Sequence, residues 1–249
     1  MLNIKIGILN LSNPLTRPLD DLIDWLQAEG FQIAVSPYLY DQQASPAQKA
    51  AVFNAWMREN VFDFVFDVSG GDLANTTIPY LDVEAYRQAK TVFAGYSDLT
   101  CVLNVLCVQK PAVLYQLRNH GRQRELLDWL RKENEDLLVQ KGVYGGNIRC
   151  LLKLAGTGRF PDLTQKTLLL ESFSGSSQRI ESDFAQLAMM GVFTKIRALV
   201  LGRFTELFQS RDGRVELERI ARQYYLGPIR FDDRIGHQYD AFAAVLGES

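Results

Sequence analysis

TVFAGYSDLTCVLNVLCVQK, residues 91–110, places a strand pattern and a helix pattern on either side of one serine. The apolar run up to Gly95 predicts a buried strand, and the apolar residues after Ser97 predict a helix. The same order recurs upstream, where FDFVFDVSGG (62–71) predicts another buried strand that ends in two glycines. Such alternation predicts an α/β protein with a parallel sheet covered by helices.

The alternation continues in both directions along the chain. In an open sheet of this kind, chemistry gathers beyond the carboxyl ends of the strands, and both VSGGD (68–72) and AGYSD (94–98) follow such ends. The remaining segments predict strands at 5–12, 31–40, 166–174 and 196–207, and helices at 17–30, 45–60, 177–193 and 215–227.

Composition bounds the class of protein. Of the 249 residues 47% are hydrophobic and 22% charged, which is typical of a globular protein with a real core. The formal charge of −2, without a basic block, argues against nucleic-acid binding. No apolar stretch approaches the roughly 18 residues of a membrane span, and the N-terminus lacks the features of a signal peptide, so we expect a cytoplasmic protein with no membrane partner.

The length favours one large or two modest domains. RQRELLDWLRKENEDLLVQK (122–141) is highly charged and prone to form a helix, so it separates two halves of the chain. We expect an N-terminal domain at 1–121, a connector at 122–144 and a C-terminal domain at 145–249.

Ser97 has two interpretations. A serine at the start of a helix commonly caps it, because its oxygen accepts a backbone N–H, and local sequence favours this role. A nucleophile needs the same turn, where its oxygen projects beyond the sheet and the helix N-terminus offers N–H groups to an oxyanion. Gly95 fits the glycine of the G-x-S-x-G elbow two positions before the serine, but Leu99 stands where a small residue is expected. The elbow motif is half met.

Other residues offer partners for a nucleophile. Gly70 and Gly71 let the backbone approach a ligand, and an N–H of their loop is suited to an oxyanion hole, although a plain turn is the alternative. Glu171 ends a buried strand, so it is either a surface residue at the rim of the sheet or an acid that orients a catalytic base. His237 is a better base than His120, which has more polar neighbours. The three cysteines form no CxxC pair, so we predict no metal site and interpret them as small buried residues.

Several of these motifs together resemble the serine peptidases that comprise LD-carboxypeptidases (muramoyltetrapeptide carboxypeptidases) and microcin C self-immunity proteins. The resemblance covers most of the chain in the family's order. It runs through SGGDLANTTIPYLD (69–82), GYSDLT (95–100), GGNIRCLLKLAGT (145–157), LLLES (168–172), MMGVFTKIRALVLGRF (189–204) and GH (236–237).

The resemblance implies a catalytic triad of Ser97, Glu171 and His237. It also implies that the N–H groups of Gly71 and Asp98 form the oxyanion hole. The first domain would be flavodoxin-like or glutamine-amidotransferase-like and would carry the nucleophile. The smaller C-terminal α/β domain would contain a β-barrel-like core and carry the glutamate and the histidine. A homodimer without cofactor or metal is expected.

The departures from the family concern the substrate. Gly70, Asp72 and Thr76 are expected to line the substrate site, but an arginine that relatives place near this pocket is missing from the segment. A guanidinium is well suited to a substrate carboxylate, and threonine cannot replace its charge. The chain also has few residues after His237, which predicts a thinner pocket wall or a shortened end.

Three functions follow from this resemblance and its departures. The first is a serine peptidase that releases D-alanine from a cytoplasmic muropeptide tetrapeptide. The second is an amidase that resembles the microcin immunity proteins and cleaves aminoacyl or peptidyl nucleotide conjugates. The third is a binding module of the same fold that has lost turnover.

Overall fold

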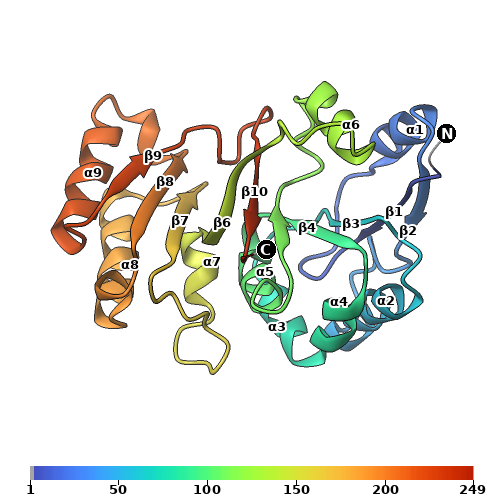
Figure 1. The fold of residues 1–249 in the computed structure, drawn as a ribbon, viewed down its shortest axis with the longest axis horizontal. Coiled ribbons are helices and arrows are strands. Elements are labelled where there is room, and N and C mark those ends of the chain that lie inside the picture. Colours follow the sequence, from blue (N-terminus) through green and yellow to red (C-terminus); the bar gives the residue numbers. More distant parts are fainter. Residues whose placement is uncertain (1–2, 249) are drawn as a thin grey trace.

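The computed structural model describes residues 3–248, and within that range it contains one ten-stranded sheet (Figure 1). Across the sheet the strand order is β2-β1-β3-β4-β5-β10-β6-β7-β8-β9. The expected α/β class is therefore confirmed. The strands are β1 (Lys5–Leu9), β2 (Gln32–Val35), β3 (Phe64–Asp67), β4 (Val92–Gly95), β5 (Ala112–Leu114), β6 (Leu138–Asn147), β7 (Thr167–Ser172), β8 (Ala198–Phe204), β9 (Ile229–Phe231) and β10 (Ala243–Leu246).

The sheet reverses direction at its centre. Strands β1 to β5 pair in parallel with one another, and so do β10 and β6 to β9. Strand β10, however, runs antiparallel to β5. The two halves of the sheet therefore point in opposite directions, and a strand from the C-terminal end of the chain joins them.

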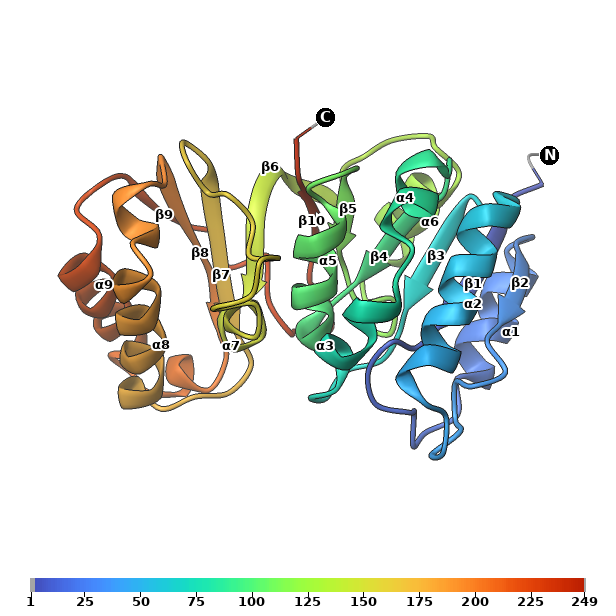
Figure 2. The same ribbon diagram turned by 90° about the horizontal axis from the view of Figure 1, so that it is seen from below.

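Helices cover both faces of the sheet in the N-terminal half (Figures 1 and 2). Helices α1 and α6 pack on one face, and α2, α4 and α5 lie on the other, where α7 and α8 continue the layer. No helix of the described range is long and apolar enough to cross a membrane. The helices are α1 (Asp20–Ala28), α2 (Pro46–Glu59), α3 (Ala74–Thr77), α4 (Val83–Gln88), α5 (Thr100–Leu106), α6 (Gln123–Leu130), α7 (Ile148–Leu152), α8 (Ser177–Met189) and α9 (Gly213–Tyr224).

The expected β-barrel-like core of the C-terminal half is not confirmed. Strands β6 to β9 are parallel neighbours in the same open sheet as the N-terminal strands. The reason is their connection, because α7, α8 and α9 each carry the chain from one strand to the next. Such crossovers keep successive strands parallel.

The segment at 122–144 contains α6 and the first part of β6 rather than one long charged helix. Helix α6 ends where Lys132 takes a left-handed φ of +62°, and the amide of Asn134 donates to the carboxylate of Asp128 at 2.9 Å. Side-chain bonds of this kind compete with helix continuation. The sheet resumes at Leu138.

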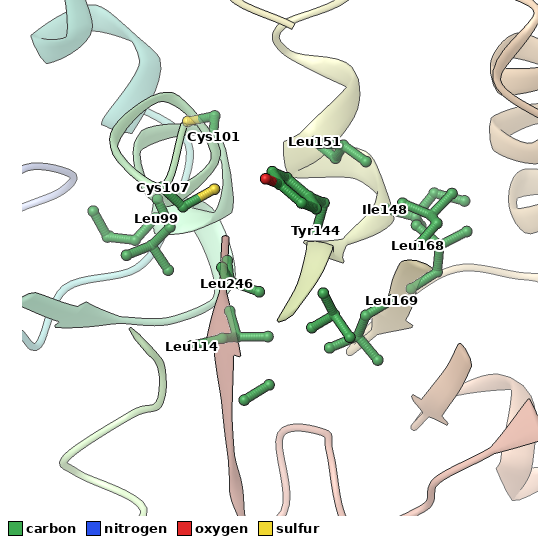
Figure 3. Close-up of a cluster of buried hydrophobic side chains, with 14 of the residues drawn as sticks. Leu99, Cys101, Cys107, Leu114, Tyr144, Ile148, Leu151, Leu168, Leu169 and Leu246 are labelled. Carbon is green, nitrogen blue, oxygen red and sulfur yellow. The ribbon is translucent and has the colours of Figure 1, made fainter. Parts of the chain in front are cut away.

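Buried side chains from both halves meet where β10 joins them (Figure 3). Leu114 of β5 and Leu246 of β10 belong to the same hydrophobic cluster as Tyr144 of β6 and Leu169 of β7. Cys107 lies in this cluster, and all three cysteines are free and buried, which confirms their interpretation as small core residues. One shared core thus holds the turn after β4 against the C-terminal half.

Candidate active site

Ser97 adopts a strained backbone conformation between β4 and α5. Its φ is +54°, and the side chain makes no hydrogen bond to the described residues. A non-glycine residue in the left-handed region costs about 1–3 kcal/mol and persists where the surroundings impose it. The helix-cap role is therefore not observed, because a 3-10 turn at Ser97–Leu99 precedes α5 and no side chain caps either element.

The packing of this turn explains the half-met elbow motif. A Cβ at Gly95 would lie 3.1 Å from the Cβ of Leu99, so a larger residue would crowd that buried leucine. The glycine two positions before Ser97 leaves room for the leucine two positions after it, which fills the core. The hydroxyl of Ser97, which is half-buried, is left free.

His237 is hydrogen-bonded to Glu171, as the resemblance implies. The ring Nδ1 lies 2.8 Å from the Oε2 of Glu171, whose side chain is fully buried, while that of His237 is 10% exposed. A carboxylate at Nδ1 fixes the tautomer in which Nδ1 carries the proton and Nε2 is the acceptor. Within residues 3–248, Nε2 has no hydrogen-bond partner. The imidazole is thus oriented with a free basic nitrogen.

Aromatic contacts place His237 against the serine turn. The ring of Tyr96, the residue before Ser97, meets the imidazole edge to face with centroids 4.8 Å apart. Phe173 contacts it from another side at 5.1 Å. The amide of Asn119 donates to the carbonyl of His237 at 3.2 Å, which ties the histidine loop to the segment after β5. Burial, with the nearby charge of Glu171, holds the pKa of Tyr96 well above its usual value, so the phenol stays neutral.

The loop after β3 contains Gly71, one of the two residues expected to form the oxyanion hole. Gly71 has a φ of +111°, and a Cβ there would lie 2.3 Å from the Oδ1 of Asn13. That Oδ1 accepts the N–H of Asp72 at 2.9 Å, so the loop is fixed around a position that only glycine tolerates. The N–H of Gly71 has no acceptor among the described residues. The N–H of Asp98 lies before the first hydrogen bond of the 3-10 turn, which Leu99 donates to Tyr96.

Asp98 joins the serine turn to that loop through its side chain. The carboxylate is fully buried and accepts the hydroxyl of Ser12 at 2.6 Å and the N–H of Ala74 at 2.8 Å. It also forms an ion pair with the ammonium of Lys153, which donates in addition to the carbonyl of Asp72 at 2.8 Å. Both proposed oxyanion donors are therefore positioned by one buried network.

The residues expected to bind substrate differ in their surroundings. Asp72 is largely exposed and pairs with the guanidinium of Arg149, and the Nη2 of Arg149 donates to the carbonyl of Gly71 at 3.3 Å. Thr76 uses its hydroxyl locally, on the carbonyl of Leu73 at 2.6 Å. Gly70 leaves open space, since a Cβ there would meet no atom within 4 Å.

Arg149 and Lys153 were missed by the sequence reasoning. Both lie in GGNIRCLLKLAGT, on or directly after α7, and their spacing of four residues puts them on one helical face. In the sequence, that spacing indicates two cations on the same side of a helix. The N-terminal segment lacks its expected arginine, but the structure brings a guanidinium to the same loop from the C-terminal half.

The remaining histidine, His120, packs between aromatic rings of α1 and of the His237 loop. His120 stacks on Trp25, with centroids 5.4 Å apart, and its Nδ1 lies 3.1 Å from the carbonyl of Arg118. Over residues 3–248, no group of three or more His, Cys, Asp or Glu side chains is placed to hold a metal ion.

The site thus combines a serine in a strained turn with a histidine bonded to a glutamate, and within residues 3–248 no hydrogen bond joins the Ser97 hydroxyl to the Nε2 of His237. Residues 6–116 match the family model of the LD-carboxypeptidase N-terminal domain, and residues 142–249 match that of the LD-carboxypeptidase C-terminal domain. The chain belongs to the LD-carboxypeptidase family.

Two curated relatives illustrate the range of the family. A putative carboxypeptidase of Vibrio cholerae is 23% identical over 86% of this chain and 81% of its own length. The microcin C7 self-immunity protein MccF of Escherichia coli is 22% identical over 75% of this chain and 70% of its own. Both relatives are distant in sequence.

Solved structures have the same fold. Muramoyltetrapeptide carboxypeptidase from Oxalobacter formigenes superposes with a TM-score of 0.82 at 20% identity, over 98% of this chain and 92% of that one. Wild-type MccF superposes with a TM-score of 0.83 at 18% identity, over 99% of this chain and 92% of that one. At such identities the likeness extends to the fold and leaves the substrate open.

Proposed function

We propose that this chain is a serine carboxypeptidase that releases D-alanine from a muropeptide tetrapeptide by hydrolysing an L,D amide bond. The observation that supports this most is the left-handed conformation of Ser97, whose free hydroxyl lies in the turn that packs against His237. A strained strand-to-helix turn of this kind is where a nucleophilic serine is housed. The match to LD-carboxypeptidase family models supports the choice of substrate class.

In the proposed mechanism, the Oγ of Ser97 attacks the carbonyl carbon while the Nε2 of His237 takes the hydroxyl proton. Glu171 keeps the imidazole in the required tautomer and stabilises the imidazolium through its 2.8 Å contact. The imidazolium then gives the proton to the leaving nitrogen, and D-alanine departs. Water, deprotonated by the same imidazole, hydrolyses the acyl-enzyme and restores Ser97.

The negative oxygen of the tetrahedral intermediate would lie between the N–H groups of Gly71 and Asp98. Fixed donors of this kind stabilise the transition state without reorganisation, and each is worth about 10²–10³ in kcat. The buried carboxylate of Asp98 supports this role because it anchors the loop of Gly71 through the N–H of Ala74.

The test uses wild-type protein and the Ser97→Ala variant, each incubated with L-alanyl-D-glutamyl-lysyl-D-alanine or its diaminopimelate analogue. Release of D-alanine is followed by mass spectrometry. We expect release by wild type alone. Absence of release by the wild type would contradict the proposed substrate, and equal release by both would contradict the role of Ser97.

Phe173 favours a second candidate function. Phe173 is 56% exposed as a residue although its ring contacts His237, so a flat aromatic surface adjoins the site. Such a ring is suited to stack on a nucleobase. Structures of MccF contain aspartyl sulfamoyl adenosine or adenosine monophosphate. Turnover of an aminoacyl sulfamoyl adenosine in competition with the tetrapeptide distinguishes the two functions, because the amidase would prefer the former.

A further inference from the structure

The guanidinium of Arg149 lies at the edge of the proposed oxyanion hole and remains open to solvent. Its Nη2 donates to the carbonyl oxygen of Gly71 at 3.3 Å, and its side chain is 41% exposed. Lys153, which lies on the same helical face, is instead 15% exposed and is held by Asp98 and by the carbonyl of Asp72. Of these two cations, Arg149 is the one that a ligand can reach.

The ion pair between Arg149 and Asp72 leaves several N–H groups of the guanidinium available. The carboxylate of Asp72 accepts a hydrogen bond from Nη1, and its side chain is 70% exposed, so this surface pair adds little to stability. A guanidinium has five N–H donors in a planar fork, and the two contacts to Asp72 and Gly71 leave others free. The contacts therefore orient the fork while keeping it able to bind an anion.

The guanidinium of Arg149 lies about one substrate residue away from the proposed position of the scissile carbonyl oxygen. The nitrogen and the carbonyl oxygen of one residue are about 3 Å apart, so Nη2 lies within roughly 7 Å of the N–H of Gly71. In a carboxypeptidase substrate the terminal carboxylate belongs to the residue directly after the scissile bond. One residue spans about 3.8 Å. A carbonyl oxygen bound at Gly71 thus leaves the terminal carboxylate within reach of Arg149.

We infer that Arg149 binds the C-terminal carboxylate of the substrate and makes the enzyme selective for peptides with a free C-terminus. The inference rests on the proposed function and names the group that selects its substrate. The N-terminal segment supplies no guanidinium at this loop, so the C-terminal half provides the charge through α7. A fixed planar cation binds a carboxylate through two parallel hydrogen bonds, which an amide cannot replace.

The test compares the tetrapeptide with its C-terminal D-alaninamide on wild type, Arg149→Met and Arg149→Lys. Binding is measured by calorimetry in the Ser97→Ala background, and hydrolysis with Ser97 present. Arg58→Met is the matched control, because Arg58 forms an exposed pair with Asp82. We expect Arg149→Met to weaken binding of the free acid about 10- to 100-fold and that of the amide less than about twofold. Arg149→Lys is expected to recover part of the loss.

Labelling by a fluorophosphonate, which carries no carboxylate, separates recognition from damage to the site. The inference is supported if Arg149→Met slows labelling by much less than it weakens binding of the free acid. It is overturned if acid and amide binding fall equally, if labelling slows as much as acid binding weakens, or if the acid-to-amide preference survives the substitution. A wild-type protein that is labelled yet neither binds nor hydrolyses either peptide would instead refute the proposed function, and the inference with it.

Discussion

Replacing Lys153 by methionine removes an ammonium group from the buried carboxylate of Asp98. That carboxylate is fully buried and the Lys153 side chain is 15% exposed, so water cannot compensate for the lost charge. Removing one partner of a buried pair costs about 3–5 kcal/mol. Because the hydroxyl of Ser12 and the N–H of Ala74 still donate to Asp98, we expect the lower end, about 3 kcal/mol.

Urea unfolding at pH 7, followed by tryptophan fluorescence, measures this loss. The double variant Lys153→Met/Asp98→Asn removes both charges and should recover most of the stability, with a coupling energy above about 2 kcal/mol. Lys141→Met is the matched control, because Lys141 pairs with Glu135 at the surface with both side chains more than half exposed. Its expected cost is below about 1 kcal/mol.

A cost for Lys153→Met as small as that for Lys141→Met would refute the reasoning. It would mean that water reaches the Asp98 carboxylate in the folded protein. An additive double variant would lead to the same conclusion, since two independent sites show no coupling.

Two further predictions concern the site, and a third concerns Asp67, the buried last residue of β3. Gly71→Ala places a Cβ 2.3 Å from the Oδ1 of Asn13 and should lower kcat about 10²–10³-fold, measured on the peptide substrate. Glu171→Gln keeps the shape of the side chain beside His237 but removes its charge, and should lower kcat by about 10⁴-fold. The free energy of unfolding should change by less than about 1 kcal/mol. Burial raises the pKa of Asp67 from 3.8 to about 6, so the folded state binds this proton more tightly. Stability should therefore fall by about 2 kcal/mol as the pH rises from 4 to 6.5, and urea unfolding of Asp67→Asn should lack this fall.

Local pattern was sufficient for most elements of the fold. Strand and helix periodicity predicted the segments around Ser97, and the glycine pair after β3 pointed to the loop that Gly71 occupies. These features depend on neighbours within a few residues, so they are visible in one sequence. The role of Ser97 was the exception, because a serine at this position can act as a helix cap or as a nucleophile. Only its left-handed backbone φ, seen in the structure, distinguishes these two roles.

Non-local pairing was beyond the reach of the sequence. The reversal of the sheet depends on β10, four residues near the C-terminus that pair with β5 and β6 from the middle of the chain. The approach of His237 to Tyr96, and of Arg149 to the loop of Gly71, follows from that pairing. The four-residue spacing of Arg149 and Lys153 indicates a cationic helical face but not the loop that this face meets, which is why Arg149 was missed.

Covalent labelling with a fluorophosphonate, read by intact-mass spectrometry and peptide mapping, tests whether Ser97 is an activated nucleophile. We expect a single adduct on Ser97 in the wild type, no adduct in Ser97→Ala, and labelling slowed at least about 10³-fold in His237→Gln. An unlabelled wild-type protein, an adduct at another residue, or a labelling rate independent of His237 would contradict this expectation.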